Sequence, residues 1–202
     1  MGVIWFFFFR GSDSRGVDEL NAPLASLDLS KAGQAKTIVT FKTNRGDIVL
    51  ELFTEEMPIT TGNFLRLAQE GFYNGTKFHR VISGFMIQGG DPNSKGDNKN
   101  SYGQGGPGYT IQDEFVAGFS NIRGTIAMAN IGQPNSGGSQ FFINLGDNLG
   151  LDFDKEPLAS KHPVFGIVID GMDVVDAIAS VPTGQNDIPI EPVIINEIVV
   201  GE

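Results

Sequence analysis

Hydrophobic and polar residues alternate along the chain from about residue 37 onward. Residues 37–43 and 47–53 each alternate with a period of two, and a polar Asn-Arg-Gly turn separates them, which predicts a β-hairpin. Six further strand-like runs cover 77–82, 85–88, 125–129, 140–144, 164–169 and 193–200.

Two segments have helical spacing instead. In the first, Pro58 suits the opening turn of a helix, and apolar residues then recur at helical intervals until Gly71. Residues 171–181 predict a second helix, and a long glycine-rich loop runs from about 89 to 110. Eight short strands with only two helices favour a mainly β fold, built as a mostly antiparallel barrel.

The first 36 residues lack this periodicity, and we interpret them as a tail or linker that precedes one domain spanning 37–202. The apolar run at 3–9 would span roughly 10 Å as a helix, against about 30 Å for a bilayer core, so no stable membrane span is expected. Arg10 follows the run, whereas a signal peptide places its basic residues first. The segment is either a truncated signal segment or a misassigned start, so the compartment stays open between cytoplasmic and exported or periplasmic.

The composition of the chain argues against several kinds of partner and site. A formal net charge of −10 disfavours nucleic acid as a partner, because phosphate binding needs a basic face. The absence of cysteine excludes disulfides and thiolate chemistry, and the two histidines lack zinc-site spacing. We therefore expect no metal and no cofactor. The 16 phenylalanines predict a phenylalanine-rich core.

Three short motifs suggest other functions. Residues 103–108 match the glycine pattern of dinucleotide-binding loops, but a Pro-Gly pair is a poor start for the helix that such loops require. Residues 91–102 open like a calcium loop but end in Tyr102 instead of glutamate, which favours a structural turn. Ser139 with His162 leaves a serine hydrolase open, although the usual G-x-S-x-G turn is absent.

An arginine at position 80 stands in an otherwise apolar run, and a buried guanidinium needs a partner. Three other segments, 124–132, 135–145 and 161–166, combine amides with apolar side chains. Taken one by one, these residues read as core phenylalanines, satisfied amides and half of an ion pair. Taken together, they predict an apolar cleft with one cation and several amides.

The wording of these segments, FHRVISGFMIQGGD, GTIAMANIG, NSGGSQFFINL and KHPVFG, resembles the cyclophilin family of peptidyl-prolyl cis-trans isomerases over about residues 37 to 200. The stretch GPGYTIQDEF is more similar to bacterial and archaeal single-domain members than to animal cytosolic ones. The resemblance implies a closed eight-stranded antiparallel barrel capped by two α-helices. It also implies catalysis of rotation about X-Pro peptide bonds, in the service of protein folding.

By the same resemblance, Arg80 is the catalytic residue and Gln88 holds its guanidinium. The other implied substrate-binding residues are Phe85, Met86, Phe142 and Leu151 in the proline pocket, His162 at its rim, and Ala129, Asn130 and Gln140 along the peptide backbone. His79 is expected to point elsewhere. The implied partners are proline-containing peptides and unfolded or partly folded proteins, bound by a monomer. A binding module or chaperone with incidental turnover is the alternative, although binders of this kind often lose the arginine.

One position departs from the family. Many cyclophilins carry Trp-Leu-Asp before the last segment, and alignment on Leu151 and Asp152 puts Gly150 at the aromatic position. The loop 146–161 is also longer than usual, so another side chain such as Leu149 could replace the missing ring. We expect peptide turnover to persist and cyclosporin binding to be weak.

Overall fold

The structure is a computed structural model that describes residues 37–158 and 161–201. The interpretation of residues 1–36 as a tail lies outside these residues and stays a prediction. The strands are β1 (Thr37–Thr43), β2 (Gly46–Leu52), β3 (Thr76–Lys77), β4 (Arg80–Ile82), β5 (Met86–Gly89), β6 (Thr125–Met128), β7 (Phe141–Asn144), β8 (Val164–Asp170) and β9 (Ile194–Val200). The helices are α1 (Pro58–Gln69) and α2 (Met172–Ala179), with 3₁₀ turns η3 (Pro92–Lys95), η4 (Lys99–Ser101), η5 (Leu149–Leu151) and η6 (Gln185–Asp187).

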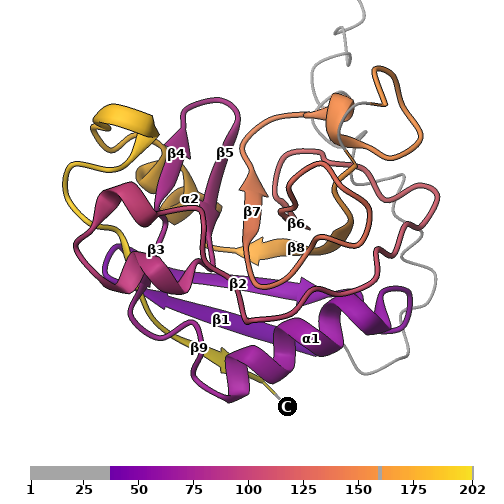
Figure 1. Cartoon of the computed structure of the whole chain (residues 1–202), viewed down its shortest axis with the longest axis horizontal. Helices are drawn as coiled ribbons and strands as arrows, with labels where there is room; N and C mark the ends of the chain where they lie inside the picture. Colours follow the sequence, from indigo (N-terminus) through magenta and orange to yellow (C-terminus); the bar gives the residue numbers. More distant parts are fainter. Residues whose placement is uncertain (1–36, 159–160, 202) are drawn as a thin grey trace, which may run out of the picture. The chain divides into compact units, whose positions relative to one another are not determined.

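All nine strands belong to one antiparallel sheet in the order β3-β9-β1-β2-β8-β6-β7-β5-β4, which curls round in Figure 1. The mainly β fold with two helices is confirmed. The predicted hairpin is also confirmed, because β1 pairs with β2 from Thr37↔Leu52 to Thr43↔Gly46.

The closed eight-stranded barrel is not confirmed, because the run expected at 77–82 is two strands. β3 pairs with β9, whereas β4 pairs with β5, at the other end of the strand order. The chain changes partner at Phe78 and His79, where Phe78 N–H still bonds to Val193 O at 2.9 Å. No ladder joins β3 to β4 in the described part of the chain, so the sheet is open in its hydrogen bonding.

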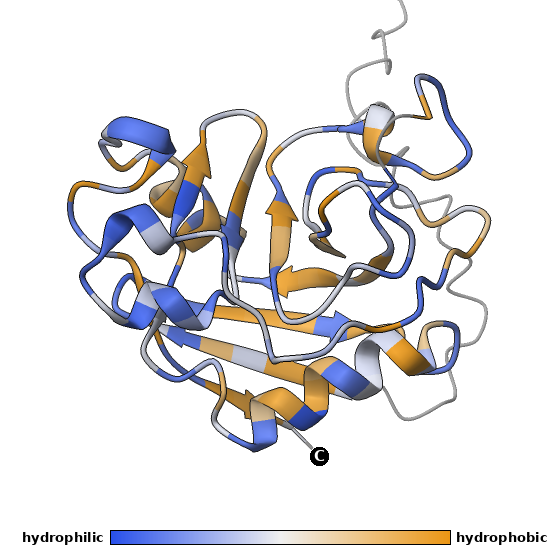
Figure 2. Ribbon diagram, in the orientation of Figure 1, coloured by the Kyte–Doolittle hydropathy of each residue, from blue (hydrophilic) through white to orange (hydrophobic). Residues whose placement is uncertain are grey.

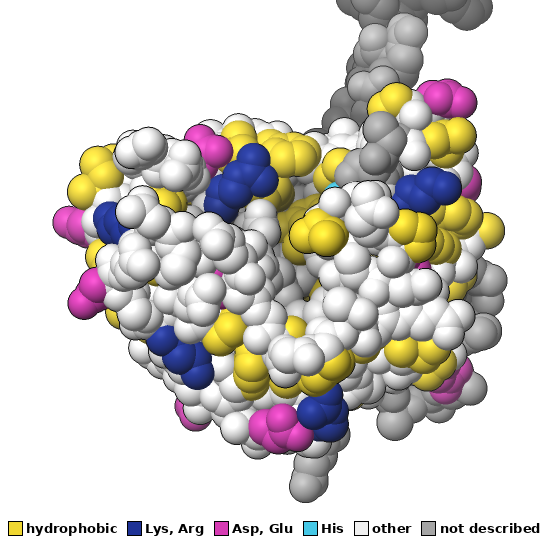
Figure 3. Space-filling model, viewed as in Figure 1, with side chains coloured by type: hydrophobic (Ala, Val, Ile, Leu, Met, Phe, Trp, Pro, Cys, Tyr) yellow, Lys and Arg dark blue, Asp and Glu magenta, His cyan; other side chains and the backbone are white. Residues whose placement is uncertain are grey.

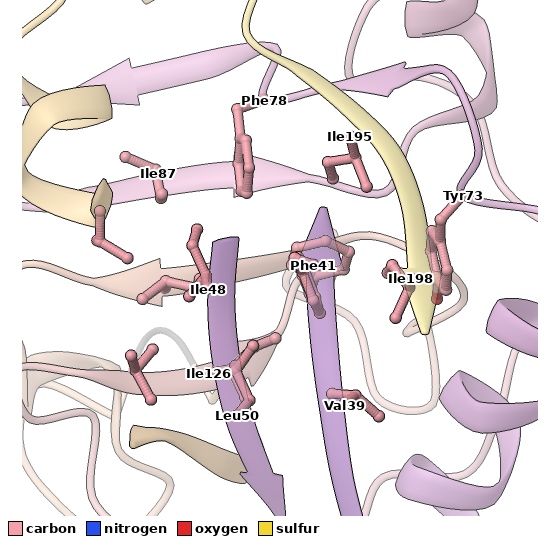
Figure 4. Packing of buried hydrophobic residues seen from close by; sticks show 14 of the residues in the cluster. Val39, Phe41, Ile48, Leu50, Tyr73, Phe78, Ile87, Ile126, Ile195 and Ile198 are labelled. Atoms are coloured by element: carbon pink, nitrogen blue, oxygen red, sulfur yellow. The ribbon is translucent and has the colours of Figure 1, made fainter. Parts of the chain in front are cut away.

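Alternating side chains of the strands fill the core. Val39 and Phe41 of β1 and Ile48 and Leu50 of β2 are fully buried (Figure 4), and Figure 2 shows hydrophobic residues concentrated on the strands. Phenylalanine dominates this core, as predicted. Several pairs of aromatic rings lie at edge-to-face geometry, which favours aromatic contacts. Among the residues that the structure describes, the fully buried aromatic side chains are Phe41, Phe64, Tyr73, Phe78, Phe141 and Phe165.

Both helices pack against strands of the sheet, and specific residues fix where each helix begins. In α1, Phe64 stacks on Phe41 of β1 with ring centroids 5.9 Å apart, and Figure 1 shows the helix beside β1 and β9. The Glu114 carboxylate accepts the free N–H groups of Ile59 and Thr60 at the start of this helix. Gly171 begins α2 at φ +83°, where a Cβ atom would lie 2.3 Å from Asp47 O, so only glycine fits.

Candidate active site

One row of the sheet crosses four neighbouring strands. Arg80 in β4 lies opposite Gln88 in β5, Gln88 lies opposite Phe142 in β7, and Phe142 lies opposite Ala127 in β6. Side chains in register on paired strands point to the same face. This row therefore brings the guanidinium, an amide and an apolar floor together on one surface.

The adjacent row points the other way. Val81, Ile87, Ile143 and Ile126 are in register on the same four strands and belong to the main core. The strand period of two therefore places Arg80 outside the core, although both of its neighbours in the sequence are buried. This answers why an arginine occurs in an apolar run: its side chain points away from the core.

A second hydrophobic cluster forms on the outer face, apart from the main core. Its buried members are Met86, Ala127, Phe142 and Val164, and the residues packed around them are Phe53, Ile82, Phe85, Phe119, Ala129 and Leu151. The cluster contains all four side chains predicted for the proline pocket. Figure 3 shows hydrophobic atoms around a hollow on the viewed face, with a histidine and a basic side chain nearby.

His162 lies at the edge of this cluster. Its ring meets Phe142 edge-on with centroids 5.2 Å apart, and Nδ1–H donates to Met128 O at 3.0 Å. Its backbone N–H bonds to Leu151 O at 3.0 Å, which links the rim to the pocket wall. Burial lowers the pKa of His162 below its usual value, so the imidazole is neutral at physiological pH and contributes shape instead of charge.

The amide groups form a hydrogen-bonded chain beside the floor. Gln88 Nε2 donates to Gln140 Oε1 at 3.0 Å, and Gln140 Nε2 donates to Gly103 O and Gly105 O at 3.1 and 2.8 Å. The carboxamide of Gln140 thus has one lone pair of Oε1 left for a ligand. These hydrogen bonds connect β5 to the glycine-rich loop.

Asn130 has an engaged side chain but, within the described part of the chain, free backbone groups. Its side chain is occupied, since Nδ2 donates to Lys161 O at 2.7 Å and Oδ1 accepts from Gly132 N–H at 3.0 Å. Its backbone N–H and C=O have no hydrogen-bond partner within the described residues. A half-buried residue with a free donor and a free acceptor beside an apolar pocket can pair with an extended peptide.

Known proteins match this architecture. A sequence profile of the family described as "Cyclophilin type peptidyl-prolyl cis-trans isomerase/CLD" matches residues 38–200. The chain belongs to this cyclophilin-type family. It is an isomerase of X-Pro peptide bonds, as the sequence predicted.

Individual cyclophilin-type relatives align over most of their length. "Peptidyl-prolyl cis-trans isomerase B" of Escherichia coli (strain K12) is 47% identical over 172 residues, which covers 82% of this chain and 100% of the relative. "Peptidyl-prolyl cis-trans isomerase cyp18" of Streptomyces antibioticus is 44% identical over 162 residues, covering 78% of this chain and 94% of the relative.

Solved structures agree with the sequence matches. A crystal structure of a cyclophilin-type isomerase from Cryptosporidium parvum superposes with a TM-score of 0.73 at 34% identity, covering 83% of this chain and 99% of that one. A second crystal structure of that isomerase, determined in the presence of the dipeptide Ala-Pro, has a TM-score of 0.71 at 34% identity, covering 82% of this chain and 99% of the other.

Arg80 has a partner that the sequence reasoning missed. Its Nε lies 3.5 Å from Asp187 Oδ2, and the two side chains are 44% and 47% exposed. The expected contact with Gln88 is absent from the hydrogen bonds of the described residues: Gln88 Nε2 donates to Gln140, and Gln88 Oε1, the atom that could accept from a guanidinium, has no partner there. Asp187 gave no signal in the sequence, since an acidic residue in a Gly/Asn/Pro-containing loop is ordinarily a solvated one.

A buried carboxylate stabilises the loop between β7 and β8 through hydrogen bonds. Asp152, 2% exposed, accepts hydrogen bonds from Ser120, from the backbone and side chain of Asn121, and from Lys155 Nζ at 2.8 Å. Burial raises the pKa of Asp152, but these donors outweigh burial and lower it overall. The aspartate thereby holds η5, which carries Gly150 and Leu151, next to the pocket.

Gly150 itself is exposed, and a Cβ atom there would meet only Pro157 Cδ at 3.6 Å. Leu149 beside it is 43% exposed, and Phe153 stacks on Phe115 with centroids 5.0 Å apart. Neither side chain belongs to the outer cluster. Among the described residues, therefore, no aromatic side chain of this loop lies in the outer cluster.

The other motifs have structural roles. Ser139, 1% exposed, donates from Oγ to Gly90 O at 2.8 Å, so its hydroxyl joins the segments just outside β7 and β5. Asp91 is buried and accepts the backbone N–H groups of Asn93 and Gly103, as a turn residue does. Residues 37–158 and 161–201 contain no group of three or more histidine, aspartate or glutamate side chains placed to hold a metal ion. In the same residues no helix is long and apolar enough to cross a bilayer.

Proposed function

We propose that the outer-face cleft over β4, β5, β7 and β6 is the active site, where a proline-containing segment binds and its X-Pro bond rotates. The observation that carries the proposal is the row in which Arg80 stands at one end and Phe142 lies in the floor. The cleft offers one cation, an apolar pocket and free backbone groups. Isomerisation requires no more, because no bond is broken.

Binding follows from the shapes and polarities present. The pyrrolidine ring has no N–H and suits an apolar floor, here Met86 and Phe142 with the half-buried Phe85, Ala129 and Leu151 at its sides. The free N–H and C=O of Asn130 would pair with the backbone of the substrate, and the last lone pair of Gln140 Oε1 would accept one further N–H. These contacts hold one side of the X-Pro bond while the other side turns. The Ala-Pro dipeptide named with the Cryptosporidium structure supports a proline ligand for this cleft.

Catalysis follows from the charge that develops during rotation. Amide resonance sets a barrier of about 18–20 kcal/mol, and uncatalysed X-Pro exchange takes tens of seconds. As the bond twists, the proline nitrogen becomes pyramidal and regains its lone pair, which a guanidinium N–H of Arg80 can meet. The planar ground state lacks this acceptor, so the hydrogen bond stabilises the transition state selectively. Exchange in milliseconds requires about 10⁴-fold acceleration, or about 5.5 kcal/mol.

Arg80→Ala tests the assignment. We expect it to remove at least about nine-tenths of kcat/KM for an X-Pro peptide, since a transition-state hydrogen bond is lost. The melting temperature should stay within about 2 °C, because a half-exposed ion pair adds little stability. Peptide exchange and thermal unfolding are measured on the same samples. Arg45→Ala is the matched control, since Arg45 is another exposed arginine with one carboxylate partner, Glu191 at 3.0 Å.

The same assay separates the enzyme from a proline-segment binding module. A module would bind the peptide in wild type and in Arg80→Ala alike, with slow exchange in both. Wild-type exchange at the uncatalysed rate would favour the module, and Arg80→Ala with more than about a tenth of wild-type activity would refute the role given to Arg80.

A further inference from the structure

The guanidinium of Arg80 touches one charged side chain in the described part of the chain, and it does so through one atom. Nε lies 3.5 Å from Asp187 Oδ2, and the contact is a charge contact without an aligned hydrogen bond. The two terminal nitrogens of Arg80 have no partner within these residues. They remain available to a ligand in the adjacent cleft.

The neighbouring amide does not take over this task. Gln88 lies directly opposite Arg80, but within the described residues no hydrogen bond joins Gln88 Oε1 to the guanidinium, and Gln88 Nε2 donates to Gln140 Oε1 at 3.0 Å. A guanidinium on a flexible stem, with free terminal nitrogens and no anchor, would sample many orientations. Among the described residues, Asp187 is the charged side chain in contact with Arg80, and it is therefore the candidate for limiting the orientations of the guanidinium.

The backbone around Asp187 is shaped in an uncommon way. Asn186 and Asp187 have φ values of +59° and +58°, the left-handed region that side chains other than glycine rarely adopt. Hydrogen bonds from Gly184 N–H to Ile188 O and from Ile190 N–H to Pro182 O close the loop, and Ile188 is buried beneath it. A strained conformation persists where the surroundings enforce it, and here it presents the carboxylate to β4.

We propose that Asp187 is a positioning residue for Arg80: it holds Nε so that the terminal nitrogens face the twisting proline nitrogen. The inference rests on the function proposed for Arg80. An ion pair this exposed adds little to folding stability. Loss of this ion pair should therefore lower kcat and leave folding stability nearly unchanged.

Two substitutions test this without disturbing the loop. Asp187→Asn keeps the shape and tolerates left-handed backbone, whereas Asp187→Gly removes the side chain at a φ that suits glycine. We expect kcat to fall about threefold in the first and about tenfold in the second, because small misplacements of a catalytic group are costly, with KM unchanged within about twofold. Asp176→Asn is the matched control, because Asp176 pairs with Arg123 at 2.8 Å, is 51% exposed and should leave kcat unchanged.

A double-mutant cycle separates positioning from a general effect on the fold. Once Arg80 is alanine, Asp187→Gly should change kcat no further. If Arg80→Ala keeps its activity, the proposed function itself fails. If Arg80→Ala is inactive but Asp187→Gly turns over like wild type, the proposed function stands and the positioning role is overturned. An equal loss from Asp187→Gly in both backgrounds, or a loss confined to KM, would also overturn it.

Discussion

At the scale of single residues, His79, just before β4, and Arg80, its first residue, show how neighbouring positions diverge in role. His79 is buried, 3% exposed, and meets Tyr102 edge-on with centroids 6.4 Å apart. Neither ring nitrogen has a hydrogen-bond partner among the described residues. Burial lowers the pKa of His79; the Asp91 carboxylate and the nearby Lys77 backbone, which is too poorly aligned to count as a hydrogen bond, oppose this, while the Arg80 guanidinium adds to it.

This burial predicts acid sensitivity. Because the folded-state pKa of His79 is lowered, the unfolded chain binds more protons below its ordinary pKa of about 6.5. The contribution of neutral His79 to the free energy of unfolding is fully present above about pH 6.5. As pH falls toward the folded-state pKa, the free energy of unfolding decreases by at most about 1.4 kcal/mol per pH unit. We expect His79→Leu to lose less unfolding free energy than wild type between pH 7.5 and 5.5, measured by urea denaturation. His162 contributes in the same direction and stays in both proteins, so equal losses would contradict the prediction.

At the scale of elements, the loop from β7 to β8 decides how the rim of the pocket is built. The buried Asp152 holds η5 in place, and the position expected to carry an aromatic ring is the exposed Gly150. The Phe115–Phe153 stack stabilises the loop away from the outer cluster. Among the described residues, this loop therefore contributes no aromatic side chain to the outer cluster.

Gly150→Trp tests this reading of the rim. Fully burying a large aromatic side chain contributes roughly 1.5–3 kcal/mol, which corresponds to about ten- to hundredfold in affinity. We expect wild type to bind cyclosporin weakly and Gly150→Trp to bind it at least about tenfold more tightly, with little change in peptide turnover. Drug titration during peptide exchange measures both quantities. Wild-type inhibition at nanomolar drug, or no gain from the tryptophan, would refute the alignment across this loop.

At the scale of the whole molecule, the sheet, both helices and the cleft lie within 37–158 and 161–201, and the family profile begins at residue 38. We therefore expect a chain starting at Thr37 to keep both folding and activity. Its kcat/KM should lie within about twofold of the full chain, with one cooperative transition, as is usual for a small single domain. Thermal unfolding and peptide exchange on the two proteins provide the measurement. A marked fall in melting temperature would mean that residues 1–36 pack on the domain.

Much of the fold could be predicted because its signals are local. The period of two in 37–43 and 47–53 predicted the hairpin, and Pro58 and Gly71 marked both ends of α1 within two residues. The splitting of the run at 77–82 could not be predicted, because its cause is a change of pairing partner from β9 to β5. A run of strand-forming residues does not specify which strand it pairs with.

The sequence by itself specified the residues that we propose for the cleft, because their motifs are long enough to identify a family and their alternation separates Arg80 from the core. Tertiary structure alone decided how that arginine is held. Gln88 turns to Gln140, and Asp187 arrives from a loop near the other end of the chain. Such contacts depend on distances that folding creates between remote segments, and neither periodicity nor local propensity encodes them.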